Sequence, residues 1–194
     1  MAVNEQSGLD PALYPTGAAE STGSAVSWSA ITAGTVAAVA LTLTLITLGS
    51  AFGLASVSPW PGAGATAATF TIGAGIWLIV TQWLSSALGG YLTGRLRTRW
   101  HGLHTDEVFF RDTAHGFMTW ALATVIIALV AVAAVSISGS AGSPEDVYVT
   151  KEAADVAHKA AATFATFTGL SLVIGAFVGS VAGAIGGRLR DLHP

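Results

Sequence analysis

The chain has 194 residues, of which 52% are hydrophobic and only 10% are charged, and its formal net charge is −3. Soluble domains carry about 25% charged residues, so this deficit indicates a membrane protein. With eight Lys and Arg in total, the chain offers no electrostatic basis for nucleic-acid binding. The absence of cysteine excludes disulfides, thiolate nucleophiles, iron–sulfur clusters and cysteine-ligated zinc.

Residues 1–24 are small and polar, contain Pro11 and Pro15, and include no Lys or Arg. This composition predicts a flexible N-terminal tail, followed by one transmembrane domain over residues 25–194. A signal peptide would place positive charge before a short apolar core. Here acidic residues precede a long apolar run, so we expect the first span to be retained.

Four apolar runs follow, and each exceeds the roughly 20 residues that a membrane-spanning helix needs. None of them contains Asp, Glu, Lys or Arg. The predicted spans are residues 28–57, 65–94, 113–137 and 160–187. Alternating charges over about 144–159 predict an extramembrane helix that leads into the last span. The expected fold is therefore an all-α membrane protein with four transmembrane helices.

Small residues recur every four positions in three of these runs. This spacing places them along one stripe of a helix, and small residues let transmembrane helices approach closely. The longest stripe is Gly175, Gly179, Gly183 and Gly187; shorter ones are Ser86, Gly90 and Gly94, and Gly49 and Gly53. We predict that all of them are helix-packing residues. The pattern leaves open whether the last stripe packs within the chain or against another subunit.

The segment from Gly90 to Arg97 matches the segment from Gly183 to Arg190 without a gap, and both end in the sequence GRLR. Each match closes the second helix of a predicted hairpin. The chain is therefore expected to consist of two helical hairpins related by an axis along the membrane normal, as in parallel repeats.

Arginines follow the second and fourth spans, whereas the opposite connections hold only Lys151 and Lys159 beside several acids. The positive-inside rule therefore predicts that both termini are cytoplasmic. The residues assigned to the cytoplasmic interface are Arg95, Arg97, Arg99, Arg188 and Arg190.

One group of polar residues precedes the third span. Glu107, Arg111 and His115 are spaced four apart, and Asp112 is three before His115. A shared helix face would offer a proton-relay, metal or headgroup site, or simply an ion-paired helix start that needs no ligand. Because Arg111 would oppose a cation, no metal is predicted. No catalytic motif occurs, and no catalytic residue or cofactor is predicted.

Several short motifs occur in order along the first three spans: WSAITAG from Trp28, FTIGAGIW from Phe70, GGYLTGRL from Gly89 and HGFMTWAL from His115. Together they resemble the PhnA-like integral membrane proteins of proteobacteria. The resemblance implies a bacterial inner-membrane protein of unassigned function, and it supplies no catalytic residue.

The leading hypothesis is a non-enzymatic membrane protein that acts through helix packing, as a homo-oligomer or as an accessory subunit of a larger complex. Its expected partners are the lipid bilayer and other membrane subunits or itself, not nucleic acid. A small oligomeric channel is the alternative. The third possibility is a membrane enzyme that uses the face from Glu107 to His115.

Overall fold

The computed structural model describes residues 25–58, 60, 62–99, 104–139 and 150–192. Over these residues the chain forms the helices α1 (Trp28–Ser56), α2 (Ala67–Leu96), α3 (Thr105–Gly139) and α4 (Lys151–Leu192). All four are long and apolar enough to cross a membrane, so the prediction of an all-α chain with four candidate spans is confirmed for the described residues. The predicted N-terminal tail and residues 144–149 lie outside the described residues.

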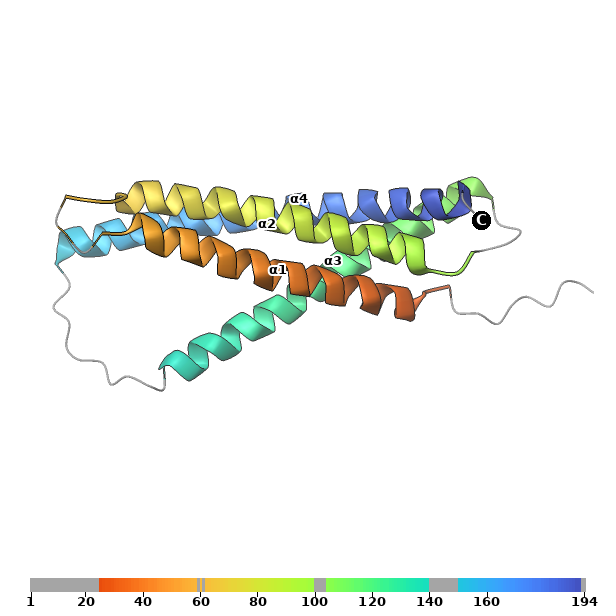
Figure 1. The fold of residues 1–194 in the computed structure, drawn as a ribbon, viewed down its shortest axis with the longest axis horizontal. Helices are drawn as coiled ribbons and strands as arrows, with labels where there is room; N and C mark the ends of the chain where they lie inside the picture. The colour runs from red at the N-terminus through yellow and green to blue at the C-terminus, as the bar shows by residue number, and fades with distance from the viewer. Residues whose placement is uncertain (1–24, 59, 61, 100–103, 140–149, 193–194) are drawn as a thin grey trace, which may run out of the picture.

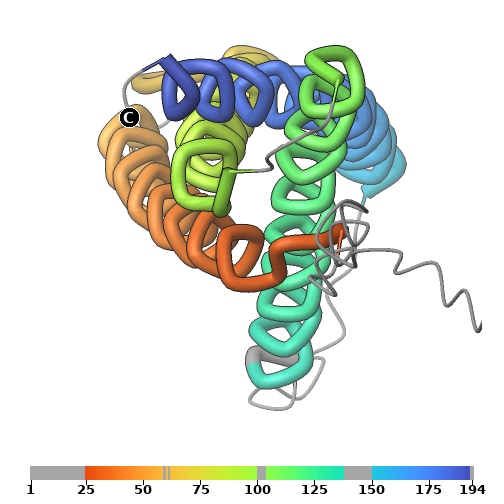
Figure 2. Tube along the Cα trace, turned by 90° about the vertical axis from the view of Figure 1, so that its right-hand side faces the viewer, coloured from red at the N-terminus to blue at the C-terminus, as the bar shows by residue number. Residues whose placement is uncertain are grey.

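The helices run up and down and meet in a bundle (Figure 1). Helix α2 is central: it packs along α4 and also against α1 and α3, whereas α1 and α4 do not meet within the described residues. In the view along the bundle, α1 and α4 lie on opposite sides of α2 (Figure 2). The start of α1, the end of α2, the start of α3 and the end of α4 lie at one end of the bundle.

Helix α4 is longer than the span predicted for it. The described part of the predicted extramembrane helix and the predicted span form one continuous helix of 42 residues from Lys151. At 1.5 Å per residue this helix is about 63 Å long, roughly twice the thickness of a hydrocarbon core. Its charged first turns therefore extend beyond the apolar layer that the other helices define.

The glycine stripe of α4, from Gly175 to Gly187, packs within the chain. A Cβ atom at Gly90 of α2 or at Gly116 of α3 would overlap the carbonyl oxygen of Gly179, and one at Gly94 would overlap that of Gly183. A Cβ atom at Gly183 would lie 2.6 Å from the carbonyl oxygen of Asp112 in α3. The stripe thus lets α4 contact the backbones of two neighbouring helices at once, which explains why it tolerates so many glycines.

Helices α1 and α2 pack backbone to backbone at one point, where a Cβ atom at Gly34 would overlap the carbonyl oxygen of Gly89. At Gly49 and Gly53 they meet through a different kind of contact. The Trp77 ring of α2 covers Gly49 of α1 and donates a hydrogen bond from Nε1 to the carbonyl oxygen of Leu45, at 2.9 Å. Phe52 meets the same ring edge-on, with the ring centroids 5.9 Å apart. Further along, Gly53 lies against Phe70. Here the small residues of one helix accommodate aromatic side chains of the other, not its backbone.

Helix α3 leaves the bundle along its length (Figure 1). Its first half packs against α4, α2 and α1, but every residue from 128 to 137 is exposed. We call residues 128–137 the distal half of α3. It is the only stretch of ten residues within an apolar span, among the described helices, in which no residue is even half-buried.

Candidate functional site

Polar side chains from three helices gather inside the end of the bundle where α4 terminates. Asp112, His115 and Thr119 of α3 lie three, four and seven residues apart, so they share one face of that helix. Thr93 and Arg97 reach them from the end of α2, and Arg190 approaches from the end of α4. All six residues are buried. We call this group the buried polar cluster.

Arg97 and Asp112 form the ion pair at the centre of this cluster. Arg97 is the C-cap residue of α2, and its Nε donates to Oδ1 of Asp112. The two side chains are 0% and 3% exposed. Gly187 of α4 makes room for the pair, because a Cβ atom there would overlap the Asp112 carboxylate. Charges held this deep depend on each other, since either one alone would lack compensation.

His115 connects α3 to the start of α1. Its Nε2 accepts a hydrogen bond of 2.9 Å from the backbone N–H of Ser27, which precedes α1. Because an amide N–H can only donate, Nε2 carries no proton, and Nδ1 donates to the carbonyl oxygen of Arg111 at 2.6 Å. Both ring nitrogens are therefore engaged with the backbone, and the imidazole is neutral in this arrangement.

Hydroxyl groups complete the cluster on the side toward the middle of the bundle. The Thr93 and Thr119 hydroxyls lie 2.7 Å apart, and both side chains are buried. Thr119 also donates to the carbonyl oxygen of His115, at 3.0 Å. The contact between the two hydroxyls joins α2 to α3 beside the ion pair. The Thr93 hydroxyl also lies 2.9 Å from the Gly89 carbonyl oxygen of its own helix.

The four residues of the predicted polar face occupy two different environments. Asp112 and His115 point into the bundle, whereas Glu107 and Arg111 form an outer ion pair of 2.5 Å with side chains 45% and 28% exposed. Each step of four residues advances about 40° around a helix. The sequence Glu107, Arg111, His115 therefore turns gradually from the exposed side of α3 to its buried side.

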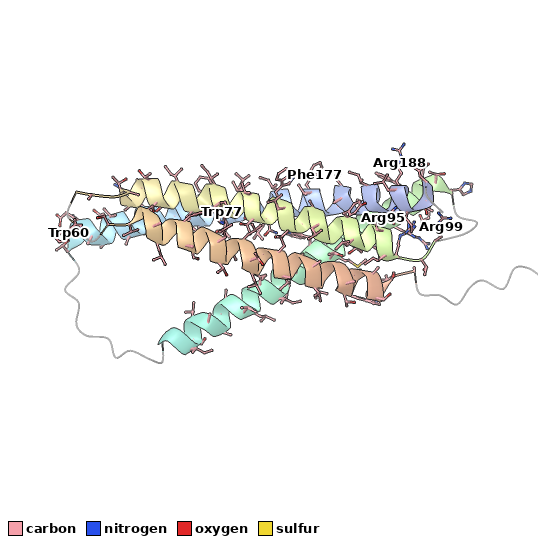
Figure 3. The ribbon with its side chains drawn as sticks, viewed as in Figure 1. Trp60, Trp77, Arg95, Arg99, Phe177 and Arg188 are labelled. Atoms are coloured by element: carbon pink, nitrogen blue, oxygen red, sulfur yellow. The ribbon has the colours of Figure 1, made fainter. Side chains whose placement is uncertain are left out.

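The five interface arginines also differ in their surroundings. Figure 3 shows Arg95, Arg99 and Arg188 at the end of the bundle opposite to Trp60. Arg188 is exposed, but Arg97 and Arg190 are buried. Arg190 donates to the carbonyl oxygens of Gly94 and Arg97, at 3.1 and 3.3 Å. It thereby satisfies carbonyl groups that the end of α2 leaves without helical partners.

Sequence reasoning did not identify Arg97 as the partner of Asp112. The sequence did hold a sign that Arg97 is special, because Arg97 and Arg190 hold the same position in the two GRLR segments. In the structure both residues are buried. Arg95 and Arg188, two residues earlier in each segment, are half-buried and exposed. Residues two apart on a helix face different directions, so only one arginine of each pair points into the bundle.

The polar interactions at this end of the bundle hold helices together. In the described part of the chain, no group of three or more His, Asp or Glu side chains is arranged to hold a metal ion. The carboxylate of Asp112 is engaged by Arg97, and the His115 ring by backbone groups. These interactions join the end of α2 and the start of α3 to the start of α1. Comparison of the chain with family models, with curated proteins and with solved structures gave no match.

Proposed function

We propose that this chain is a non-enzymatic multi-pass membrane protein that acts by associating with other transmembrane helices, as a homo-oligomer or as an accessory subunit. The observation that carries the proposal is the distal half of α3. Its ten residues are apolar or small and are exposed on every side. The buried polar cluster supports a structural role, because its ionic and imidazole groups engage one another and the backbone.

The glycine pattern left open whether the stripe of α4 packs within the chain or against another subunit, and we propose a different surface for association. The glycine stripe of α4, from Gly175 to Gly187, is occupied by α2 and α3, so it does not offer a face to a second subunit. The distal half of α3 instead combines branched side chains with alanines; these residues are Ala128, Leu129, Val130, Ala131, Val132, Ala133, Ala134 and Val135. Small residues beside branched ones favour close van der Waals packing, which drives helix association in lipid.

A second copy of the chain is the partner that we propose first. The same surface on two copies gives a two-fold interface, which is the commonest symmetry of oligomers. Since the chain has no cysteine, single-cysteine variants report only on the position chosen. We expect Val132→Cys, at a residue 66% exposed, to form a disulfide-linked dimer when native membranes are mildly oxidised. Val173→Cys of α4, at a residue 69% exposed, is the matched control and should remain monomeric.

A scan of single cysteines from Leu129 to Ile137 refines this test. Cross-linking that rises and falls every three to four residues indicates a helix–helix interface. An adduct heavier than the dimer, obtained with a bifunctional thiol-to-amine reagent, indicates an accessory subunit of another complex. Monomer at every position, with both reagents, would contradict the proposal.

We further propose that the protein lies in a bacterial inner membrane with both termini in the cytoplasm. The gathering of arginines at one end of the bundle supports this orientation. A green fluorescent protein fused after Pro194 is expected to fluoresce, and alkaline phosphatase fused at the same point is expected to be inactive. Active phosphatase in that fusion would reverse the proposed topology.

The proposed duplication and the resemblance to PhnA-like proteins complete this interpretation. Gly94 corresponds to Gly187 in the two matching segments. The duplication is supported by the contacts of Gly94 with Gly187 and with Gly183. It is also supported by the shared burial of Arg97 and Arg190. Membership of the PhnA-like family is proposed on the four motifs of the first three spans.

A further inference from the structure

A cavity of about 250 Å³ lies in the middle of the bundle and is lined by residues of all four helices. It is separate from the buried polar cluster except at Thr119, which contributes to both. Ser171 of α4 and Thr81 of α2 line it, and both lie near the midpoint of their helices. Among the described residues, no charged side chain lines the cavity.

Four buried polar atoms in the wall of this cavity have no hydrogen-bond partner in the described part of the chain. They are Oγ1 of Thr81, Oγ of Ser85, Nε1 of Trp120 and Oγ1 of Thr124. Thr81 and Ser85 are only 4% and 3% exposed. Buried polar groups are nearly always paired, so four such atoms around one cavity call for an explanation.

Other threonines in the helices show that a hydroxyl without a hydrogen-bond partner is not a general property of helical threonine. Hydroxyls within a helix normally donate to the carbonyl oxygen four residues earlier. Among the described residues, ten threonine hydroxyls make this contact: Thr42, Thr44, Thr47, Thr71, Thr93, Thr113, Thr119, Thr163, Thr166 and Thr168. The hydroxyls of Thr81 and Thr124 do not, and both belong to the cavity wall.

The lining defines the chemistry of a ligand. Hydroxyls donate and accept hydrogen bonds, and an indole N–H only donates, so the wall suits an oxygen atom of a hydroxyl or carbonyl group. Without a charged residue at this depth an ionised ligand would be unstable, which favours a neutral molecule. The rest of the wall is apolar and includes Ile46, Leu78 and Ile127. A cavity of 150 Å³ holds benzene, so about 250 Å³ accommodates on the order of ten non-hydrogen atoms.

The cavity also reaches the surface that would face the bilayer. Ala128 and Ala131 line it, and both are exposed residues of the distal half of α3. A molecule dissolved in the hydrocarbon layer could therefore enter sideways, beside the part of α3 that diverges from the bundle. We propose that this cavity binds a small neutral amphiphile from the membrane, with its hydroxyl or carbonyl oxygen held by Thr81, Ser85, Trp120 and Thr124.

The test uses the full chain in nanodiscs of neutral lipid and an octanol that carries a photoreactive diazirine. We expect saturable labelling of peptides that contain residues 78–86 of α2 and 119–131 of α3. Unlabelled 1-octanol should compete, and octane of similar size should compete at least tenfold more weakly, because it offers no oxygen to the wall. Labelling that does not saturate, or that octane and octanol suppress equally, would overturn the proposal.

A pair of isosteric variants separates binding from folding. Thr81→Val together with Thr124→Val removes two hydroxyls without changing the shape of the wall, and should weaken competition by 1-octanol about tenfold. Thr44→Val together with Thr47→Val is the control, since these hydroxyls are exposed and bonded to their own helix. The cavity variant should match the unliganded wild type in melting temperature or exceed it, because the lost hydroxyls had no partner. A melting temperature below that of the unliganded wild type would show that the Thr81 and Thr124 hydroxyls have hydrogen-bond partners within the protein, and would also overturn the proposal.

Discussion

Gly90→Leu is expected to abolish the compact form of the protein, whereas Gly73→Leu in the same helix is expected to leave it intact. At Gly90 even a Cβ atom would overlap the carbonyl oxygen of Gly179, and a backbone atom of α4 cannot rotate away. At Gly73 a Cβ atom would meet nothing within 4 Å. Both variants gain the same side chain, so their difference isolates the contact between α2 and α4.

The expected cost of Gly90→Leu is about 3 kcal/mol or more, since overpacking a tight contact typically costs 1–3 kcal/mol and here the two helices must separate. The measurement is thermal unfolding in mild detergent, followed by size-exclusion chromatography of the soluble fraction. Gly73→Leu should melt within a few degrees of the wild type. Equal melting temperatures for the two variants would mean that α2 and α4 do not meet at Gly90 and Gly179.

Asp112→Asn is expected to destabilise the protein by about 3–5 kcal/mol, because it leaves the Arg97 charge buried without its carboxylate partner. Arg97→Gln should cost a similar amount for the converse reason. The double variant should be more stable than either single variant, since it removes both charges and leaves two neutral amides that can bond to each other. The free energy of unfolding of all four proteins completes a double-mutant cycle.

The outer pair on the same helix is the control for this cycle. Glu107 and Arg111 are partly exposed, so replacing either by alanine should cost less than about 1 kcal/mol. The interaction free energy should therefore be large for Arg97 with Asp112 and small for Glu107 with Arg111. Similar values for the two pairs would contradict the buried position of the inner one.

The spans were predictable because an uncharged apolar run of sufficient length leaves the chain few alternatives. The predicted run 28–57 and the helix Trp28–Ser56 nearly coincide. Hydropathy does not mark the ends of helices beyond the apolar layer, and the helix before the last span was predicted only from its alternating charges. Helix α4 continues back to Lys151 through charged residues that form helix in water equally well, so hydropathy marks the membrane boundary and not the end of the helix.

The candidate site was predictable only in part. Asp112 and His115 stood out because polar residues are rare next to a span, but their pairing depends on how α3 is rotated against α2 and α4. No local pattern reports that rotation. The hydroxyls of the cavity were still less accessible, because Thr81 and Thr124 are indistinguishable in sequence from threonines that bond to their own helix.

The hydrogen bond from Ser27 to His115 has a consequence for biosynthesis. The two residues are 88 positions apart, so at about 5–20 residues per second the acceptor is synthesised about 4–18 seconds after the donor. During this interval α1 and α2 are synthesised, whereas most of α3 and all of α4 are still to be made. Their early cohesion rests on contacts within the hairpin, among them the Trp77 bond to Leu45. The start of α1 is therefore synthesised first, but its hydrogen bond to α3 can form only after His115 has been made.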